Sequence, residues 1–442
     1  MNNRPSFSLS YDQLLADLHT AYLDARKHKR NRPYQLRFEA HLEENLSSLC
    51  QSLWMRTYRP NPSTCFIIRD PKQREVFAAD FRDRIVHHLY YNYVHEMLEK
   101  TFIHDSYSCI KGRGTHYGIG RLEQHIRKES QNYQEPCYVL KMDIRGYFMH
   151  IDRSRLLTIV QDSLQRMGNH RVNGHTSQRW SEKVDMDFVD YLTREIVLLN
   201  PTEDCRIRGN ASDWDGLPAS KSLFRSKEGC GLPIGNLTSQ LFSNVYLNVL
   251  DQYMKRTLKC HRYGRYVDDF CVVSADREWL RSLVPKVRRF LQEVLGLDVH
   301  EGKSQIRDVR MGVEFLGAYL KPHRRYVSNA TLCRMHRKLR LLHAVACKGV
   351  HGSVERKCLL ALRIRSSLNS FLGVLSHYRS YGIRSRMMAV EYPCFGMYGS
   401  FSRNSLLFSP SSSFQVRFMD GFVTGKSLFG AKIECEEPAK VP

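Results

Sequence analysis

Residues 263–274 read Tyr-Gly-Arg-Tyr-Val-Asp-Asp-Phe-Cys-Val-Val-Ser, and the fold prediction for this chain begins with them. The aromatic and β-branched residues predict two short strands. The acidic pair Asp268-Asp269 predicts a tight turn between the strands, because Asp is disfavoured within strands and accepted in turns. An Asp-Asp pair by itself is usually an ordinary turn, so a chemical role depends on what else the chain offers.

A third carboxylate follows another predicted strand, at residues 138–144. Successive side chains of a strand alternate between its faces, so Asp143 should face outward at the strand end. The buried face would hold Leu140, Met142 and Ile144. Two divalent cations about 3.5–4 Å apart assist phosphoryl transfer onto a hydroxyl, and carboxylates suit such hard ions. We therefore predict Asp143, Asp268 and Asp269 as catalytic residues that hold two Mg²⁺ ions, with Mn²⁺ as the alternative.

Composition narrows the class of partner. The chain has 442 residues, 42% of them hydrophobic, which fits a globular protein of several domains. Its 67 Lys and Arg exceed its 45 Asp and Glu by 22, which favours a nucleic-acid partner over a basic protein without one.

The 13 Cys include no CxxC pair, so neither a disulfide framework nor a zinc finger is expected. We find no run of about 18 apolar residues and no secretory segment, so we expect a cytoplasmic protein without a membrane partner.

The hairpin and its neighbours resemble a known family. Tyr266-Val267-Asp268-Asp269 resembles the YxDD box of reverse transcriptases, and residues 143–148 resemble their first catalytic carboxylate motif. Further blocks in the family's order lie at residues 72–74, 83–86, 107–114, 297–303 and 315–317. The resemblance covers about residues 60–385. It implies an RNA-directed DNA polymerase that copies an RNA template into cDNA, with template RNA, cDNA or primer, and dNTPs as its partners.

One block narrows the resemblance further. Residues 231–240, Gly-Leu-Pro-Ile-Gly-Asn-Leu-Thr-Ser-Gln, carry Ile234 where the common form has Gln and Gln240 where it has Pro. This version is similar to the reverse transcriptases of diversity-generating retroelements, which misincorporate opposite adenine. The resemblance therefore implies an error-prone polymerase and a small basic accessory protein that docks on it.

The matched blocks also imply the residues that bind the nucleotide. They are Lys72, Arg74, Phe148, Ile234, Gly235, Gln240 and Lys303. Phe148 would lie beneath the incoming sugar and clash with a 2′-hydroxyl, while a plain core position is the alternative. Arg74, with Lys72 nearby, would pair with triphosphate oxygens, and Lys303 would give a proton to the leaving pyrophosphate. For Arg74 and Lys303 the alternative is a solvated surface position.

The block at residues 231–240 would act on base selection. Gly235 would let the backbone approach the nascent base pair closely. Ile234 cannot hydrogen-bond as the usual Gln can, which would remove about 1 kcal/mol of discrimination. We expect this loss to loosen base selection.

We expect an α+β, right-hand polymerase fold with fingers, an antiparallel-sheet palm and a helical thumb. The predicted parts are an N-terminal helical extension (1–59), fingers (60–135), the first part of the palm (136–164), an insertion (165–228), the second part of the palm with the YVDD hairpin (229–323), a basic helical thumb (324–386) and a C-terminal tail (387–442). The thumb prediction rests on 14 Lys or Arg against one acidic residue in 324–386. Apolar spacing predicts helices at 9–30, 185–199, 237–256 and 279–295, and strands near 305–309 and 313–320.

Two other functions stay open. The same fold could belong to a reverse transcriptase of phage-defence or retron-like type, although the block at residues 231–240 argues against retrons. The chain could also be a non-catalytic RNA-binding scaffold with an inactive palm. That alternative predicts the loss of catalytic carboxylates, whereas Asp143, Asp268 and Asp269 are all present.

Overall fold

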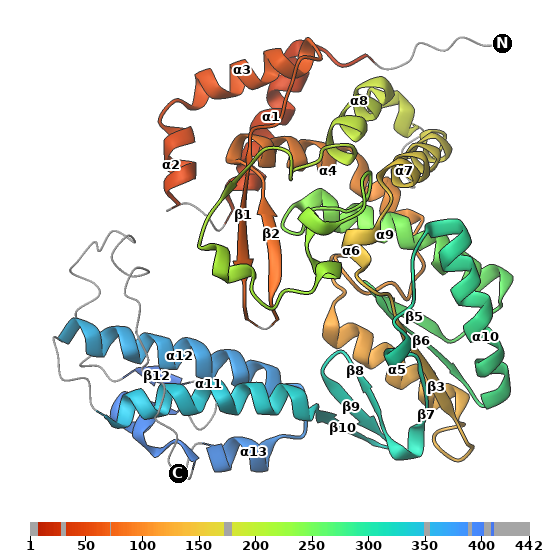
Figure 1. The fold of residues 1–442 in the computed structure, drawn as a ribbon, viewed down its shortest axis with the longest axis vertical. Helices are drawn as coiled ribbons and strands as arrows, with labels where there is room; N and C mark the ends of the chain where they lie inside the picture. Colours follow the sequence, from red (N-terminus) through yellow and green to blue (C-terminus); the bar gives the residue numbers. More distant parts are fainter. Residues whose placement is uncertain are drawn as a thin grey trace. The chain divides into compact units, whose positions relative to one another are not determined.

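The computed structural model describes residues 8–27, 32–70, 72–171, 179–348, 354–387, 391–401 and 408–410. The chain divides into two compact units, Met1–Val309 and Arg310–Pro442, and each is described here by itself. Helices and strands are mixed in both units (Figure 1), in agreement with the predicted α+β class.

Three helices open the first unit. They are α1 (Tyr11–Arg26), α2 (Pro33–Glu39) and α3 (Leu42–Trp54). Ser10 caps α1, because its hydroxyl accepts a hydrogen bond from the Gln13 backbone N–H. The buried stripe of α1 includes Leu14, Leu18 and Ala21, and it packs on α4 (Phe81–Lys100) and α3. The helix predicted at 9–30 is thereby confirmed as α1 between Tyr11 and Arg26, while residues 28–30 lie outside the described residues.

A three-stranded sheet follows, with the order β2-β1-β4. Its strands are β1 (Ser63–Ile68), β2 (Arg74–Ala78) and β4 (Cys205–Ile207). β1 and β2 form an antiparallel hairpin, while β4 runs parallel to β1. β4 belongs to the segment predicted as an insertion at 165–228, so part of that segment completes the sheet of the predicted fingers.

The second sheet carries the predicted hairpin. Its four strands are β5 (Tyr263–Tyr266), β6 (Asp269–Ser274), β3 (Tyr138–Asp143) and β7 (Gln305–Asp308), in that order, and every neighbouring pair is antiparallel. The predicted strands and the antiparallel sheet are confirmed. One detail was wrong: Asp269 is not in the turn but begins β6, where it pairs with Tyr266. Val267 and Asp268 make the turn alone.

Helices make up much of the rest of the first unit (Figure 1). They are α5 (Thr115–Glu129), α6 (Tyr147–His150), α7 (Arg153–Gly168), α8 (Met186–Val197), α9 (Leu237–Gln252) and α10 (Arg277–Phe290). α9 is buried on most of its circumference because it packs against both α4 and α7. The helices predicted at 237–256 and 279–295 are confirmed, since α9 and α10 each continue into a short π-helical turn, Tyr253–Thr257 and Leu291–Leu295.

The second unit begins with a small antiparallel sheet in the order β10-β9-β8. Its strands are β8 (Val313–Phe315), β9 (Ala318–Lys321) and β10 (Arg324–Val327). The strand predicted at 313–320 is therefore two strands, because Leu316 and Gly317 both take positive φ angles and turn the chain. Residues 324–327, expected to start a helical region, form a strand instead.

Helices make up most of the rest of this unit. They are α11 (Asn329–Cys347), α12 (Val354–Ser376) and α13 (Tyr381–Arg386), followed by the strand pair β11 (Gly399–Phe401) and β12 (Phe408–Pro410). α11 buries Met335 and Leu339 and exposes Arg334, Arg337 and Arg340. The predicted basic helical surface is thus present on α11. Of the predicted tail at 387–442, residues 388–390, 402–407 and 411–442 lie outside the described residues.

One stretch of α12, Arg356–Ser376, is long and apolar enough to cross a membrane by length and composition alone. The expectation that no such segment exists was too strict, because it counted uninterrupted apolar runs and this stretch is interrupted by Arg363 and Arg365. The core helix of a soluble protein meets the same criterion. Here Ile364, Leu368 and other residues of one face are buried within the unit.

Candidate functional site

Three carboxylates from distant parts of the chain meet at one end of the four-stranded sheet. Asp143 ends β3 and lies directly opposite Asp269, which begins β6. Opposite residues of antiparallel strands have Cα atoms about 4.5–5.5 Å apart. Asp268 precedes Asp269 in the turn, and its carbonyl accepts a hydrogen bond of 3.3 Å from the Ile144 N–H. We call these three residues the carboxylate triad.

Asp143 is not exposed as strand alternation predicted, since only 7% of the residue is accessible. Lys303 covers it, with its Nζ 2.6 Å from Asp143 Oδ2. The covering segment is fixed on the strand end, because the His300 N–H donates to the Asp143 carbonyl over 2.8 Å. Lys141 of β3 approaches the neighbouring carboxylate, with its Nζ 3.7 Å from Asp269 Oδ1. Lys303 and Lys141 therefore neutralise part of the negative charge of the carboxylate triad.

The triad is electrostatically crowded. Burial, reinforced by the charges of Asp143 and Asp269, raises the pKa of Asp268 to about 6. Burial and the charge of Asp143 also raise the pKa of Asp269, although Lys141 opposes the shift. Burial lowers the pKa of Lys303, but its hydrogen bond to Asp143 more than compensates, so that pKa is raised overall. A crowded, all-oxygen donor set of this kind fits hard divalent cations such as Mg²⁺ or Mn²⁺.

The turn that carries the triad is strained. Val267 has a φ of 54°, in the left-handed region that a β-branched residue rarely adopts. Its backbone is held on both sides: the N–H donates to Ser108 Oγ over 3.2 Å, and the carbonyl accepts from Arg265 Nη1 over 3.0 Å. Strained backbone persists where the surroundings over-determine it. These two contacts therefore position Asp268.

A buried ion pair holds the residue that donates to the Val267 carbonyl in the turn. Arg265 and Asp251 are both fully buried, with two parallel contacts, Nη2 to Oδ2 at 2.7 Å and Nε to Oδ1 at 2.8 Å. The Tyr263 hydroxyl adds a third hydrogen bond to Asp251 Oδ1 over 2.7 Å. This network was missed from the sequence. Asp251 lies on α9, and hydrophobic spacing gives no signal for two charged residues that pair inside the core.

The block at residues 231–240 is tied to β2. The Ile234 carbonyl accepts from the Phe77 N–H over 2.9 Å, and Asn236 Oδ1 accepts from the Ala79 N–H over 3.2 Å. Gly235 between them has a φ of 131°, and a Cβ there would lie 2.9 Å from the Phe77 carbonyl oxygen. Only glycine fits this close approach. Gly235 was expected to let the backbone approach a nascent base pair. In the structure its close neighbour is the backbone of β2, and Gly235 itself is exposed to solvent.

Phe148 and Ile234 pack against the same apolar cluster. Phe148 lies on α6, five residues after Asp143, and its carbonyl accepts from the Leu232 N–H over 2.8 Å. Both side chains are half-buried against an apolar cluster that includes Phe77 and Met149. We call this group the α6 cluster. The remaining predicted contacts, Lys72, Arg74 and Gln240, are exposed, with Arg74 at the start of β2 and Gln240 in the first turn of α9.

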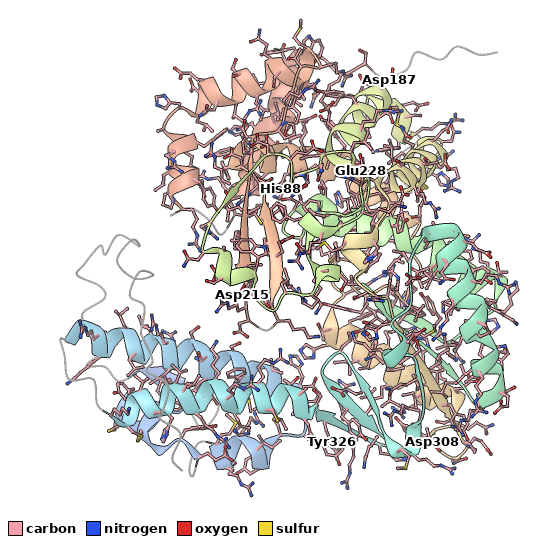
Figure 2. The ribbon with its side chains drawn as sticks, in the orientation of Figure 1. His88, Asp187, Asp215, Glu228, Asp308 and Tyr326 are labelled. Atoms are coloured by element: carbon pink, nitrogen blue, oxygen red, sulfur yellow. A yellow bond between two sulfur atoms is a disulfide. The ribbon has the colours of Figure 1, made fainter. Side chains whose placement is uncertain are left out.

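A buried carboxylate on β2 organises the segment that contains β4. Glu75 is inaccessible, and it accepts hydrogen bonds from Trp214 Nε1 over 2.8 Å and from the Leu223 N–H. Gln73 Nε2 also donates to the carbonyl of Asp215, which is labelled beside these strands in Figure 2. The predicted insertion is therefore docked on the sheet of β2, β1 and β4. An acidic residue within the apolar pattern of β2 is the signal that could have revealed this contact.

Comparison with known families identifies the class of this domain. Residues 200–320 match the family model for "Reverse transcriptase (RNA-dependent DNA polymerase)". The matched segment includes residues 231–240, Asp268, Asp269 and Lys303, whereas Asp143 lies before it. The chain thus carries, over residues 200–320, a segment similar to a reverse transcriptase domain, and its mixed helices and sheets are consistent with a right-hand polymerase fold. This is the domain of RNA-directed DNA polymerases, which are nucleotidyltransferases and use divalent metal ions.

Similar solved structures include telomerases of two Candida species. Apo telomerase from Candida tropicalis, truncated from the C-terminal domain, is 11% identical with a TM-score of 0.42, covering 59% of this chain and 53% of that one. Telomerase from Candida albicans, in complex with a TWJ fragment of telomeric RNA, is 11% identical with a TM-score of 0.40, covering 75% and 59%. The chain therefore spans little more than half the length of these telomerases. No curated protein matches the chain.

Proposed function

We propose that this protein is an RNA-directed DNA polymerase that copies an RNA template into cDNA by two-metal nucleotidyl transfer. The observation that carries the proposal is the meeting of Asp143, Asp268 and Asp269 at one sheet end, in a chain with a reverse transcriptase domain. The basic surface of α11 supports a nucleic-acid substrate, since Lys and Arg side chains neutralise phosphates.

The triad would hold the divalent ions. Bound there, such ions supply activation of the primer 3′-hydroxyl and neutralisation of the leaving pyrophosphate. Lys303 now shares Asp143 Oδ2, so a cation that takes this oxygen would displace the Lys303 ammonium. The displaced ammonium would then act as the proton donor to the pyrophosphate. Arg74, exposed at the start of β2, would pair with the triphosphate oxygens.

Primer extension tests this function. The full chain should extend a DNA primer on a polyribonucleotide template with Mg²⁺ and labelled dNTPs, and a chelator should stop the reaction. Extension should require the template, which separates polymerisation from untemplated nucleotide addition. Failure to extend with either Mg²⁺ or Mn²⁺, or equal extension without a template, would contradict the proposal.

We further propose that the polymerase is error-prone, of the diversity-generating retroelement type, and works with a small basic accessory protein. Ile234 and Gln240 support this type, because they occupy the two positions where the common form has Gln and Pro. The side chain of Ile234 packs on the α6 cluster and offers no hydrogen bond to a substrate. Selection of the correct base would therefore lack one polar contact.

Replacement of Ile234 by Gln should lower misincorporation opposite adenine about 5-fold, the equivalent of one restored hydrogen bond of about 1 kcal/mol. The measurement is sequencing of cDNA made on an adenine-rich RNA template. Ile207→Gln, on the exposed face of β4, is the control and should leave the error rate unchanged. An unchanged error rate in Ile234→Gln would refute the role of this side chain.

Removal of the Phe148 ring should admit ribonucleotides. Phe148→Ala should raise rNTP incorporation relative to dNTP about 10- to 100-fold, because the ring no longer blocks a 2′-hydroxyl. Competition assays with paired rNTP and dNTP measure this ratio. Met149→Ala removes a neighbouring side chain of the same cluster and controls for lost packing. If both variants shift the ratio equally, Phe148 is a core residue and not a sugar gate.

A further inference from the structure

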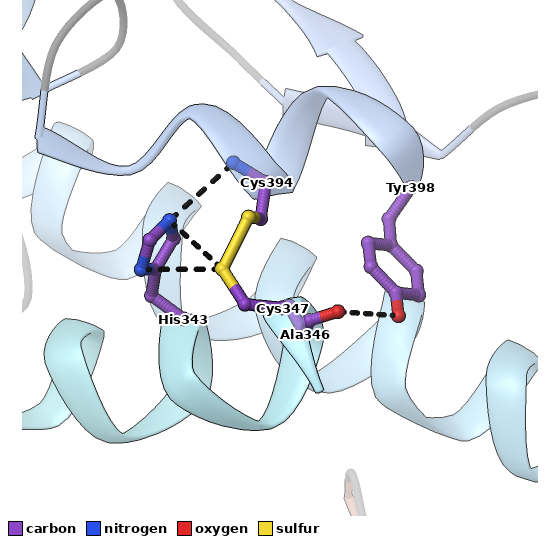
Figure 3. The surroundings of a disulfide bond; sticks show 5 residues. All are labelled: His343, Ala346, Cys347, Cys394 and Tyr398. Atoms are coloured by element: carbon purple, nitrogen blue, oxygen red, sulfur yellow. Dashed lines mark hydrogen bonds between the residues drawn. A yellow bond between two sulfur atoms is a disulfide. The ribbon is translucent and has the colours of Figure 1, made fainter. Parts of the chain in front are cut away.

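A second group of metal-ligating side chains lies in the second unit, apart from the carboxylate triad. His343 and Cys347 stand one turn apart on α11, and Cys394 lies on the short helix Pro393–Met397 (Figure 3). Cys347 and Cys394 form a disulfide, with Cα atoms 5.7 Å apart. The ligand atoms of all three residues lie within 4.8 Å of one another. Among the described residues, no other set of three His, Cys, Asp or Glu side chains meets this distance condition.

Contacts with the disulfide and with two aromatic rings fix the position of the His343 imidazole. Its Nε2 lies 3.5 Å from Cys347 Sγ and accepts a hydrogen bond of 3.4 Å from the Cys394 N–H. The rings of Tyr392 and Phe395 pack on the imidazole, each with its centroid 5.6 Å away. These contacts fix the orientation of the imidazole, which a metal ligand requires.

The spacing matches a tetrahedral zinc site. Zn–S bonds of about 2.3 Å and Zn–N bonds of about 2.0 Å place sulfur and nitrogen ligands about 3.5 Å apart and two sulfurs about 3.8 Å apart. The distance from His343 Nε2 to Cys347 Sγ already has this value. The two sulfur atoms would have to separate, which happens when the disulfide is reduced, and Zn²⁺ would replace the Cys394 N–H as the partner of the Nε2 lone pair.

We propose that His343, Cys347 and Cys394 form a redox-linked Zn²⁺ site. A dithiol reductant passes two electrons and two protons to the disulfide, which yields two thiols and the oxidised, cyclic reductant. Zn²⁺ then binds the two sulfurs and the imidazole, and the two thiol protons are released. Soft thiolates select Zn²⁺ over the hard ions that suit the triad. Cys347 is exposed, so water can complete the fourth position.

Either form joins the same two segments. The disulfide and the metal both link the end of α11 to the segment 391–401, so the connection would survive a change of redox state. The two cysteines are 47 residues apart, and no local pattern in the sequence marks them as a pair, so the sequence did not predict this connection. The site is independent of the proposed polymerase activity.

The test uses the full chain in oxidised and reduced forms, with thiol content verified by alkylation and mass spectrometry. After removal of the reductant, Co²⁺ is added and then displaced by Zn²⁺. Reduced protein should bind one Co²⁺ with thiolate-to-cobalt charge-transfer absorption, which Zn²⁺ removes, while oxidised protein should not show this band. The band reports thiolate ligands, so Co²⁺ bound at the carboxylate triad would not mimic it. A reduced protein without the band would overturn the proposal, and this comparison needs no variant.

Variants then assign the ligands. Cys347→Ser and Cys394→Ser should abolish the absorption band, and His343→Ala should weaken Zn²⁺ affinity at least about 10-fold. Cys333→Ser is the matched control, because Cys333 is an exposed free cysteine on the same helix. Retention of the band in either of the first two variants, or its loss in Cys333→Ser, would also contradict the proposed site.

Discussion

Asp268→Asn should lower the rate of RNA-templated primer extension at least about 10³-fold. A bound metal ion stabilises a phosphoryl-transfer transition state by several kcal/mol, and each 1.36 kcal/mol is about a factor of ten in rate. The substitution removes one charge from a triad in which burial, reinforced by the charges of Asp143 and Asp269, already raises the pKa of Asp268 to about 6. The measurement is a time course of cDNA synthesis with labelled dNTPs.

RNA binding should change little in the same variant, within about twofold, because no phosphate-binding cation is lost. Asp187→Asn is the matched control, since Asp187 is an exposed carboxylate on α8 (Figure 2). It should extend primers at the wild-type rate. If wild type and Asp268→Asn extend equally poorly and bind RNA equally well, the chain is a scaffold and not a polymerase.

Arg265→Met should destabilise the first unit by about 3–5 kcal/mol, because it leaves the Asp251 carboxylate buried without its cation. The melting temperature should fall by about 5–8 °C, because a unit the size of Met1–Val309 unfolds with an entropy of about 2.1 cal/mol/K per residue. Activity should fall together with stability, since Arg265 also holds the Val267 carbonyl in the strained turn. Thermal unfolding followed by circular dichroism, with primer extension measured in parallel, checks both effects.

Arg194→Met gives the comparison for a surface ion pair. Arg194 pairs with Asp190 one turn away on α8, where both side chains are substantially exposed, so its loss should cost less than about 1 kcal/mol. The double variant with Arg265→Met and Asp251→Leu should recover part of the lost stability, because it removes the unpaired charge. An Arg265→Met protein as stable as Arg194→Met would mean that the buried pair does not hold the turn.

The sheet that carries the triad could be predicted because its strands follow simple rules. Apolar alternation marked β3, and the YVDD sequence marked the hairpin of β5 and β6. These rules consider one strand at a time, so they predicted that the Asp143 side chain is exposed to solvent. They could not show that residues 300–303 fold over the strand end and place Lys303 on Asp143, because that contact joins residues 160 positions apart.

Other parts of the site depend on long-range packing that no local pattern encodes. β4 pairs in parallel with β1, although 136 residues lie between Ile68, the last residue of β1, and Cys205, the first residue of β4. The resemblance predicted a role for Ile234 but not that Ile234 and Phe148 pack against the same apolar cluster. The same limit applies to the pairing of Cys347 with Cys394, where separation along the chain conceals proximity in space.

The most direct test of the metal-binding triad is electron paramagnetic resonance of Mn²⁺ bound to the full chain. The protein would be assembled with template, primer and a non-hydrolysable dNTP analogue. Mn²⁺ is a hard ion that prefers oxygen ligands, so it reports the triad and not the His343, Cys347 and Cys394 group. We predict two magnetically coupled Mn²⁺ ions per chain in the wild type and loss of the coupling in Asp268→Asn. An uncoupled or absent Mn²⁺ signal in the wild type, or the same coupled signal in the variant, would contradict the shared-metal role of Asp143, Asp268 and Asp269.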